Sequence, residues 1–166
     1  MNIMDPDEFL QRHGEFSPQQ QLSALVRVLV GPKGCSWDQK QTALSVVEHL
    51  IDEAHELKAA LAGDSDREVG SELGDLLFTV AFLQERLATR ASTETAVAHL
   101  VEKMIRRHPH VFGGTEFADE EALKRNWEAE KRKENSARRR FDQDIPASLP
   151  SLRRAAKVLG RAMNAG

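Results

Sequence analysis

Two acidic pairs with the same internal spacing constrain the fold of this chain more than any other feature. Glu53 and Glu56 form the first pair. Glu72 and Asp75 form the second, and both lie inside long helical patterns. Residues three apart are neighbours on one face of an α-helix, so each pair can direct two carboxylates at one point. If the two helices are antiparallel partners, all four carboxylates converge.

Converging carboxylates need a positive partner. Two of them about 5 Å apart repel by about 3 kcal/mol at an effective dielectric constant of about 20. A hard divalent cation with oxygen ligands relieves this repulsion, and Mg²⁺ is the natural choice, with Mn²⁺ as a substitute. We therefore predict a metal site at these four side chains. The alternative is a pair of solvated acidic faces, which fits the second pair poorly because apolar residues follow it.

The hydrophobic pattern predicts an all-α fold, a helical bundle. The apolar pattern is helical almost throughout, and Asn-Gly and Asp-Gly hairpin signals are absent. Ser17 and Gln20 are expected to form a capping box at the first helix, and Ser65 and Glu68 a second box at the third helix. The predicted helices span residues 17–30, 42–62, 65–90, 93–107, 119–135 and 152–162.

The two central helices are expected to bury different parts of their surfaces. On the second helix we expect the acids to lie outside the apolar stripe and so to leave the core undisturbed. The third helix is apolar nearly all round over residues 73–83, which predicts burial on more than one side and favours a homodimer. The predicted stripe of the second helix consists of Leu44, Val47, Leu50, Ile51, Ala54, Leu57 and Leu61.

A second group of candidate residues is basic and aromatic. Lys103 and Arg107 are four residues apart, as are Trp127 and Lys131, so each couple shares a helix face. Cations beside a magnesium site suit a triphosphate, because Arg makes bidentate contacts to phosphate oxygens and Lys supplies a movable charge. Ordinary exposed helix faces are the alternative.

Three other features are less specific. Trp37 either stacks on a nucleobase or covers the end of the bundle, and Asp38 is expected to cap the following helix. His108 and His110 flank a proline without supporting cysteines, which is a poor zinc pattern. The basic residues within 131–140 indicate either a solvated helix end or a nucleic-acid contact; with a net charge of −3 we expect no nucleic-acid partner.

Composition favours a soluble cytoplasmic protein. Hydrophobic residues make up 40% of the chain and charged residues 30%, an ordinary globular balance. No apolar run approaches the length needed to cross a bilayer, so no membrane partner is expected. The N-terminal residues lack a secretory signal pattern, and the single cysteine, Cys35, permits no internal disulfide.

Several motifs, in order over about residues 22 to 162, together resemble the MazG-type nucleoside triphosphate pyrophosphohydrolases of the all-α NTP pyrophosphatase superfamily. Each motif alone is weak, but the set is specific. The motifs are Gly34-Cys35-Ser36-Trp37-Asp38 with Gln41-Thr42, Asp52-Glu53-Ala54-His55-Glu56, Glu72-Leu73-Gly74-Asp75-Leu76-Leu77, Arg107-His108-Pro109-His110-Val111-Phe112, Trp127-Glu128-x-x-Lys131 and Ile145-Pro146-x-Ser148-Leu149-Pro150-Ser151-Leu152-x-Arg154-Ala155.

The resemblance implies an all-α bundle, usually dimeric, that uses Mg²⁺ to split nucleoside triphosphates into monophosphate and pyrophosphate. House-cleaning of non-standard nucleotides is the family's usual role. Residues 1–16 would then be an N-terminal extension, 17–135 the catalytic helical domain, and 136–166 a linker and C-terminal helix. Glu53, Glu56, Glu72 and Asp75 would bind metal or orient water, with Glu53 or Glu56 as general base; Lys103, Arg107, Trp127 and Lys131 would contact the nucleotide, with Lys103 and Arg107 acting in catalysis.

The chain departs from the family pattern at a few positions. Asp52 stands where the family usually has Glu, Ser36 where it has Pro, and no histidine lies near Leu83. The chain ends at Gly166, where members of the family often continue. Because of Asp52 and the missing histidine, an alternative function is a non-catalytic module that senses Mg-nucleotide or binds a protein. Tight nucleotide binding without hydrolysis would distinguish that module from an enzyme.

Overall fold

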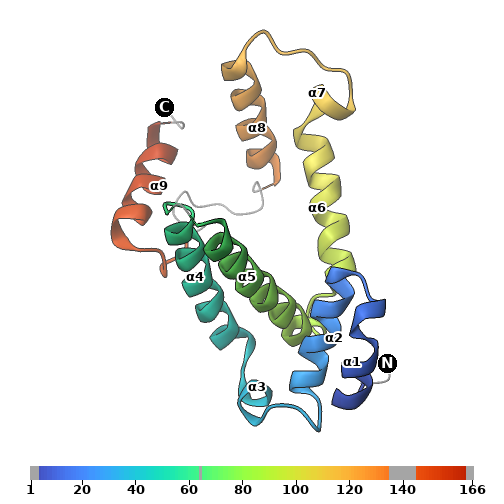
Figure 1. Cartoon of the computed structure of the whole chain (residues 1–166). Coiled ribbons are helices and arrows are strands. Elements are labelled where there is room, and N and C mark those ends of the chain that lie inside the picture. The colour runs from blue at the N-terminus through green and yellow to red at the C-terminus, as the bar shows by residue number, and fades with distance from the viewer. Residues whose placement is uncertain (1–3, 64, 135–144, 164–166) are drawn as a thin grey trace. The chain divides into compact units, whose positions relative to one another are not determined.

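The computed structural model describes residues 4–63, 65–134 and 145–163. Its elements are helices, and the described residues contain no strand, which confirms the predicted all-α class (Figure 1). The chain divides into two compact units, residues 1–98 and 99–166. The elements are α1 (Pro6–Arg12), a 3₁₀ turn (His13–Glu15), α2 (Pro18–Val30), α3 (Ser36–Lys40), α4 (Ala43–Ala60), α5 (Asp66–Leu87), α6 (Thr93–Arg107), α7 (Pro109–Phe112), α8 (Glu120–Glu134) and α9 (Ser151–Met163).

Side-chain caps explain where the long helices of the first unit begin. The capping box predicted at Ser17 is present: its backbone N–H donates to Gln20 Oε1 at 2.9 Å, and its hydroxyl accepts the Gln20 amide. At Ser65 the hydroxyl accepts the Glu68 amide at 3.3 Å, which is one bond of the expected box. A further capping box, formed by Thr42 and Ser45, starts α4 and was not foreseen.

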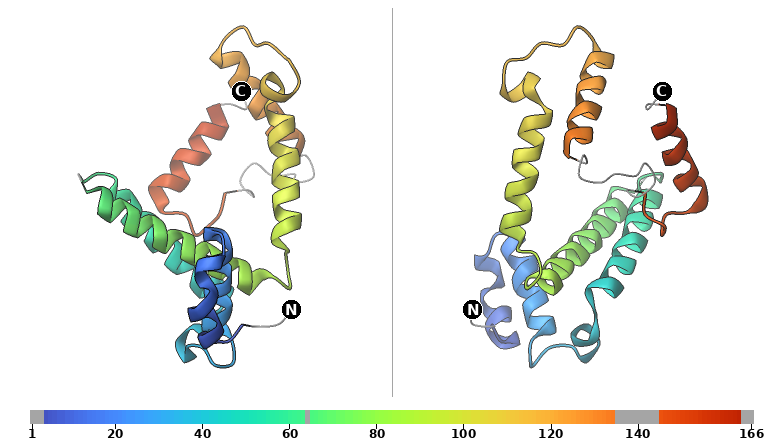
Figure 2. Two further views of the ribbon diagram at one scale, coloured as in Figure 1. Left: turned by 45° about the vertical axis from the view of Figure 1, so that its right-hand side comes forward. Right: turned by 180° about the vertical axis from the view of Figure 1, so that it is seen from behind.

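The first unit is organised around the pairing of α4 with α5. These two helices run side by side in every view, and α2 packs against α5 (Figures 1 and 2). The short connection between α4 and α5 makes them antiparallel. Arg27 of α2 also forms a 3.2 Å ion pair with Glu85 of α5. The buried core of this unit consists of Val26, Val46, Ala81 and Phe82, with Leu22, Val30, Phe78 and Leu83 packed against it.

Only one side of α5 is covered within the described part of the first unit. Ala81 and Phe82 are buried, whereas Leu73 and Leu77 are each more than two-fifths exposed. Val80 is exposed as well. The expectation that α5 is buried on more than one side is therefore not met within the first unit, and an apolar row is left on its surface.

The segment between α2 and α4 differs from its predicted form. It contains a short helix, α3, in which Asp38 is buried, so the prediction that Asp38 caps α4 is wrong; Thr42 is the cap. The Asp38 backbone carbonyl accepts a 2.6 Å hydrogen bond from Arg86 of α5, which anchors α3. Glycine is required at position 34, just before α3, because a Cβ on Gly34 would collide with the Leu29 carbonyl oxygen.

The second unit contains the end of α6, together with α7, α8 and α9. Helix α6 has the predicted bounds, and α7 occupies part of a segment expected to be a loop. Helix α9 lies where the final helix was predicted, and Leu152, Leu159 and Met163 on it are largely exposed. Within the described residues no helix combines the length and the apolar character needed to cross a bilayer. The domain boundaries at residues 16 and 135 remain predictions.

Candidate functional site

Glu53 lies on the face of α4 that packs against the rest of its unit, and Glu72 lies on the equivalent face of α5. The prediction that the acids of α4 avoid the apolar stripe is therefore wrong for Glu53. The error arose because the predicted stripe included Leu44 and Ile51, which are exposed, and omitted Val46, which is buried. At three- and four-residue intervals the covered positions are Val46, Leu50, Glu53, Leu57 and Ala60 on α4, and Val69, Glu72, Leu76, Thr79 and Leu83 on α5.

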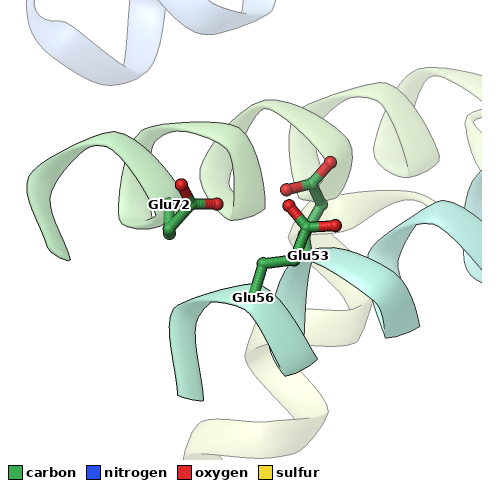
Figure 3. A group of neighbouring side chains, drawn as sticks. All are labelled: Glu53, Glu56 and Glu72. Carbon is green, nitrogen blue, oxygen red and sulfur yellow. The ribbon is translucent and has the colours of Figure 1, made fainter. Parts of the chain in front are cut away.

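Three carboxylates meet at the seam between α4 and α5, where the covered faces of the two helices pack together. One carboxylate oxygen each from Glu53, Glu56 and Glu72 lies within 4.8 Å of the others (Figure 3). Glu53 and Glu56 come from α4 and Glu72 from α5, as expected for antiparallel partners. Within the described residues this is the one group of His, Cys, Asp or Glu side chains close enough to hold a metal ion. An oxygen-only ligand set fits a hard divalent cation.

Asp75 lies outside this group of three but close to it. Its charge, together with those of Glu56 and Glu72, raises the pKa of Glu53. Burial of the Glu53 carboxyl is the largest cause of the raised pKa, and repulsion from the neighbouring acids adds to it, while His49 acts in the opposite direction. The group is therefore a place where negative charge is costly.

His49 relieves part of that cost, but no Lys or Arg of the first unit does. Among the described Lys and Arg residues of the first unit, none forms an ion pair with Glu53, Glu56 or Glu72. Fully exposed acids would lose little by lacking a cationic partner, because water solvates their charge. Glu53 and Glu72, however, are only partly exposed. A divalent cation is the partner that the donor set and its charge both fit.

Trp37 and His49 extend the site along α4. The two rings lie 5.7 Å apart between centroids, and His49 is one helical turn before Glu53. The Trp37 side chain is 55% exposed, so of its two interpretations the structure favours a surface available for contact. His49 was missed in the sequence; its spacing of four residues from Glu53 was the available signal.

The second unit brings three residues of the basic and aromatic group together. The Arg107 guanidinium carbon lies 5.0 Å from the centre of the Trp127 ring. The His108 ring contacts the same indole edge to face, with centroids 5.0 Å apart. Lys103 is one turn before Arg107 on α6, and Lys131, one turn after Trp127 on α8, forms a 3.0 Å ion pair with Glu128.

An open cavity of about 710 Å³ lies beside Trp127, and His108, His110 and Lys124 contribute to its wall. The two histidine rings are 5.7 Å apart, and His108 Nδ1 is engaged by the Met104 carbonyl oxygen at 2.7 Å. They belong to no metal-competent group among the described residues, so the structure adds nothing to the poor zinc pattern. The acids and this group lie in different units.

The chain is similar to known nucleotide hydrolases. It is 32% identical over 149 residues to the nucleoside triphosphate pyrophosphohydrolase of Escherichia coli strain K12, which covers 87% of this chain and 57% of that protein. It is 35% identical over 152 residues to the nucleoside triphosphate pyrophosphohydrolase/pyrophosphatase MazG of Thermotoga maritima, covering 89% of this chain and 57% of that protein. A match of 35% over 139 residues to the uncharacterized protein YabN of Bacillus subtilis covers 81% of this chain and 28% of that protein.

These relatives are longer than the chain, which spans little more than half of the two enzymes and about a quarter of YabN. Residues 41–112 match the MazG nucleotide pyrophosphohydrolase domain. That segment contains α4, α5 and α6, and therefore all four predicted acids. The part of this chain that carries all four acids is thus similar to the MazG nucleotide pyrophosphohydrolase domain.

Proposed function

We propose that this protein is a Mg²⁺-dependent nucleoside triphosphate pyrophosphohydrolase. It hydrolyses the α–β phosphoanhydride of ribo- or deoxyribonucleoside triphosphates and releases the nucleoside monophosphate and pyrophosphate. The observation that carries the proposal is the meeting of Glu53, Glu56 and Glu72 within the segment that matches the MazG nucleotide pyrophosphohydrolase domain. The names of the relatives from Escherichia coli and Thermotoga maritima agree with this reaction.

The carboxylates have two roles in this proposal. Glu53, Glu56, Glu72 and Asp75 hold Mg²⁺, which when bound supplies positive charge for the polyphosphate. Glu53 or Glu56 accepts the proton of the attacking water. Glu53 suits that role because burial and neighbouring charges raise its pKa, and a carboxylate with a raised pKa is the stronger base.

The basic and aromatic residues act on the nucleotide. Lys103 and Arg107 neutralise the charge that develops on pyrophosphate as the anhydride bond breaks. Lys131 adds a contact to phosphate once it exchanges its partner Glu128 for the substrate. Trp127 and the exposed Trp37 offer aromatic faces on which a nucleobase can stack.

We also propose that the protein acts as a homodimer in the cytoplasm. The exposed apolar row of α5 formed by Leu73, Leu77 and Val80 supports the dimer, because a second copy would remove it from water. Nucleotide substrates and a lone cysteine support the location. House-cleaning of non-standard nucleotides is the proposed role.

A panel of normal and modified nucleoside triphosphates tests the activity. With Mg²⁺ we expect pyrophosphate and monophosphate as primary products, and loss of both in Glu53→Gln and Asp75→Asn. Glu48→Gln is the matched control, since Glu48 is an exposed acid on α4 outside the group. Orthophosphate as the primary product contradicts the proposed reaction. Tight Mg-nucleotide binding without turnover contradicts an enzyme and supports the sensing module instead.

A further inference from the structure

The indole of Trp127 is held by the two residues at the end of α6. Arg107, the last residue of that helix, lies over the ring face, and His108, the next residue, meets it edge to face. The interplanar angle between His108 and Trp127 is 66°. Such arrangements stabilise an aromatic pair beyond the effect of the area that it buries. Two side chains that are adjacent in the sequence therefore restrain one aromatic ring of α8.

His108 is itself fixed by its backbone. Its N–H is shared between the Met104 and Ile105 carbonyl oxygens, at 3.1 and 3.2 Å. Its own carbonyl oxygen accepts the amides of Val111 and Phe112, at 3.0 and 3.1 Å. The residue thus ends α6 and caps the start of α7, which lies at the turn between α6 and α8 (Figure 1).

The His108 ring is fixed as well. Nδ1 lies 2.7 Å from the Met104 carbonyl oxygen, and because a carbonyl can only accept, Nδ1 carries a hydrogen and donates it. With its backbone and one ring nitrogen both bonded, the imidazole has little freedom to turn. It is a rigid support for the indole, whereas the Arg107 side chain has more rotatable bonds.

In the proposed function Arg107 has a second task. A guanidinium that binds phosphate oxygens has to turn toward them, which weakens its hold on the Trp127 ring face. The indole then depends on His108 to keep its orientation while a nucleobase stacks on it. His108 does not need to touch the substrate for this.

We propose that His108 is a positioning residue for Trp127: its imidazole holds the indole ready for the nucleobase while Arg107 engages phosphate. This inference rests on the proposed function, because it assumes that Trp127 is the stacking surface for a nucleoside triphosphate. It assigns a role to a histidine whose sequence pattern had suggested only a weak zinc site.

Two substitutions separate the ring from its hydrogen bond. His108→Asn keeps an N–H donor near the position of Nδ1 and removes the ring. His108→Phe keeps an aromatic ring beside Trp127 and removes the donor. If His108 only ended the helix, Asn would be the harmless change and Phe the damaging one. Positioning of the indole predicts the reverse order. His99→Asn is the matched control, because His99 is an exposed histidine of α6 far along the helix from Trp127.

The readouts are steady-state kinetics with the Mg-nucleoside triphosphate best hydrolysed in the panel, and fluorescence of Trp127. All variants carry Trp37→Phe, which leaves Trp127 as the single tryptophan. For His108→Asn we expect KM to rise about fivefold, within the range of one base–aromatic stack. We expect kcat to stay within about twofold and acrylamide quenching of Trp127 to increase. His108→Phe should show at most a third of that rise in KM.

Binding of Mg-tripolyphosphate, which has no base, should be the same in all variants. A KM for His108→Asn that is unchanged, or no higher than that of His108→Phe, overturns the inference. So does unchanged quenching of Trp127. If the parent protein hydrolyses no nucleoside triphosphate, the proposed function fails by itself, and the quenching data still decide whether His108 holds the indole.

Discussion

Glu53 of α4 and Glu72 of α5 occupy equivalent covered positions on two antiparallel helices, and their carboxylate oxygens lie within 4.8 Å of each other. Apolar residues one turn away on either side of each acid pack along the same seam. The seam therefore holds the two carboxylates in register before any ligand arrives. Such preorganisation is what a metal centre requires of its first ligands.

The first prediction concerns metal binding. Millimolar Mg²⁺ should raise Tm by several degrees, because it binds the folded state and relieves repulsion among the acids; saturation at a hundred times Kd corresponds to about 2.7 kcal/mol. Differential scanning fluorimetry measures the shift. Glu48→Gln should respond like the parent protein, whereas Glu72→Gln should respond weakly. A melting temperature that ignores Mg²⁺ contradicts the metal site.

The second prediction concerns pH in the absence of metal. The pKa of Glu53 is raised above its ordinary value of 4.5, so the folded state holds this proton more tightly than the unfolded state does. The contribution of Glu53 to stability is therefore greatest below pH 4.5 and is lost as the pH rises through the raised pKa. In EDTA at pH 7, Glu53→Gln should have a higher Tm than the parent protein. A lower Tm, with Glu48→Gln unchanged, contradicts the assigned cause.

The third prediction concerns Arg107. Replacing it with Ala removes a charge from the proposed leaving pyrophosphate and should lower kcat about a hundredfold, which is the size of effect seen for one preorganised electrostatic contact. Arg107→Lys keeps the charge without the bidentate fork, and we expect a smaller loss. Steady-state kinetics measure both. Equal kcat values for the parent protein and Arg107→Ala would remove Arg107 from the catalytic group.

The fourth prediction concerns assembly. Leu77 is 46% exposed on the apolar row of α5, and a charge there should break a dimer formed through that row. Light scattering at micromolar concentration should show twice the chain mass for the parent protein and a shift toward the single-chain mass for Leu77→Asp. Leu10→Asp, on α1, is the control, since Leu10 is exposed on a different helix. A parent protein of single-chain mass contradicts the proposed dimer.

Helix positions were predictable from the sequence because their signals are local. The Ser17 cap, the periodicity of α6 and the pattern of α9 each lie within the helix that they specify. The convergence of Glu53 with Glu72 was also predictable, because one repeated spacing implied it. The covered face of α4 could not be predicted in the same way, because Leu44 and Ile51 are apolar but exposed.

Contacts between distant segments escaped prediction for a different reason. The Asp38 carbonyl oxygen accepts a hydrogen bond from Arg86, and the Trp127 ring contacts Arg107 and His108. His49 gains its place only because α3 brings Trp37 to it. Such tertiary pairings leave no periodic trace in the sequence, so only the folded chain reveals them.

The most direct test of the central claim is ³¹P NMR of the reaction of a nucleoside triphosphate with the parent protein and with Glu72→Gln, each in the presence of Mg²⁺. The account predicts equal amounts of nucleoside monophosphate and pyrophosphate from the parent protein and almost none from the variant. Undiminished pyrophosphate release by Glu72→Gln, or orthophosphate and diphosphate as the first products, would contradict it.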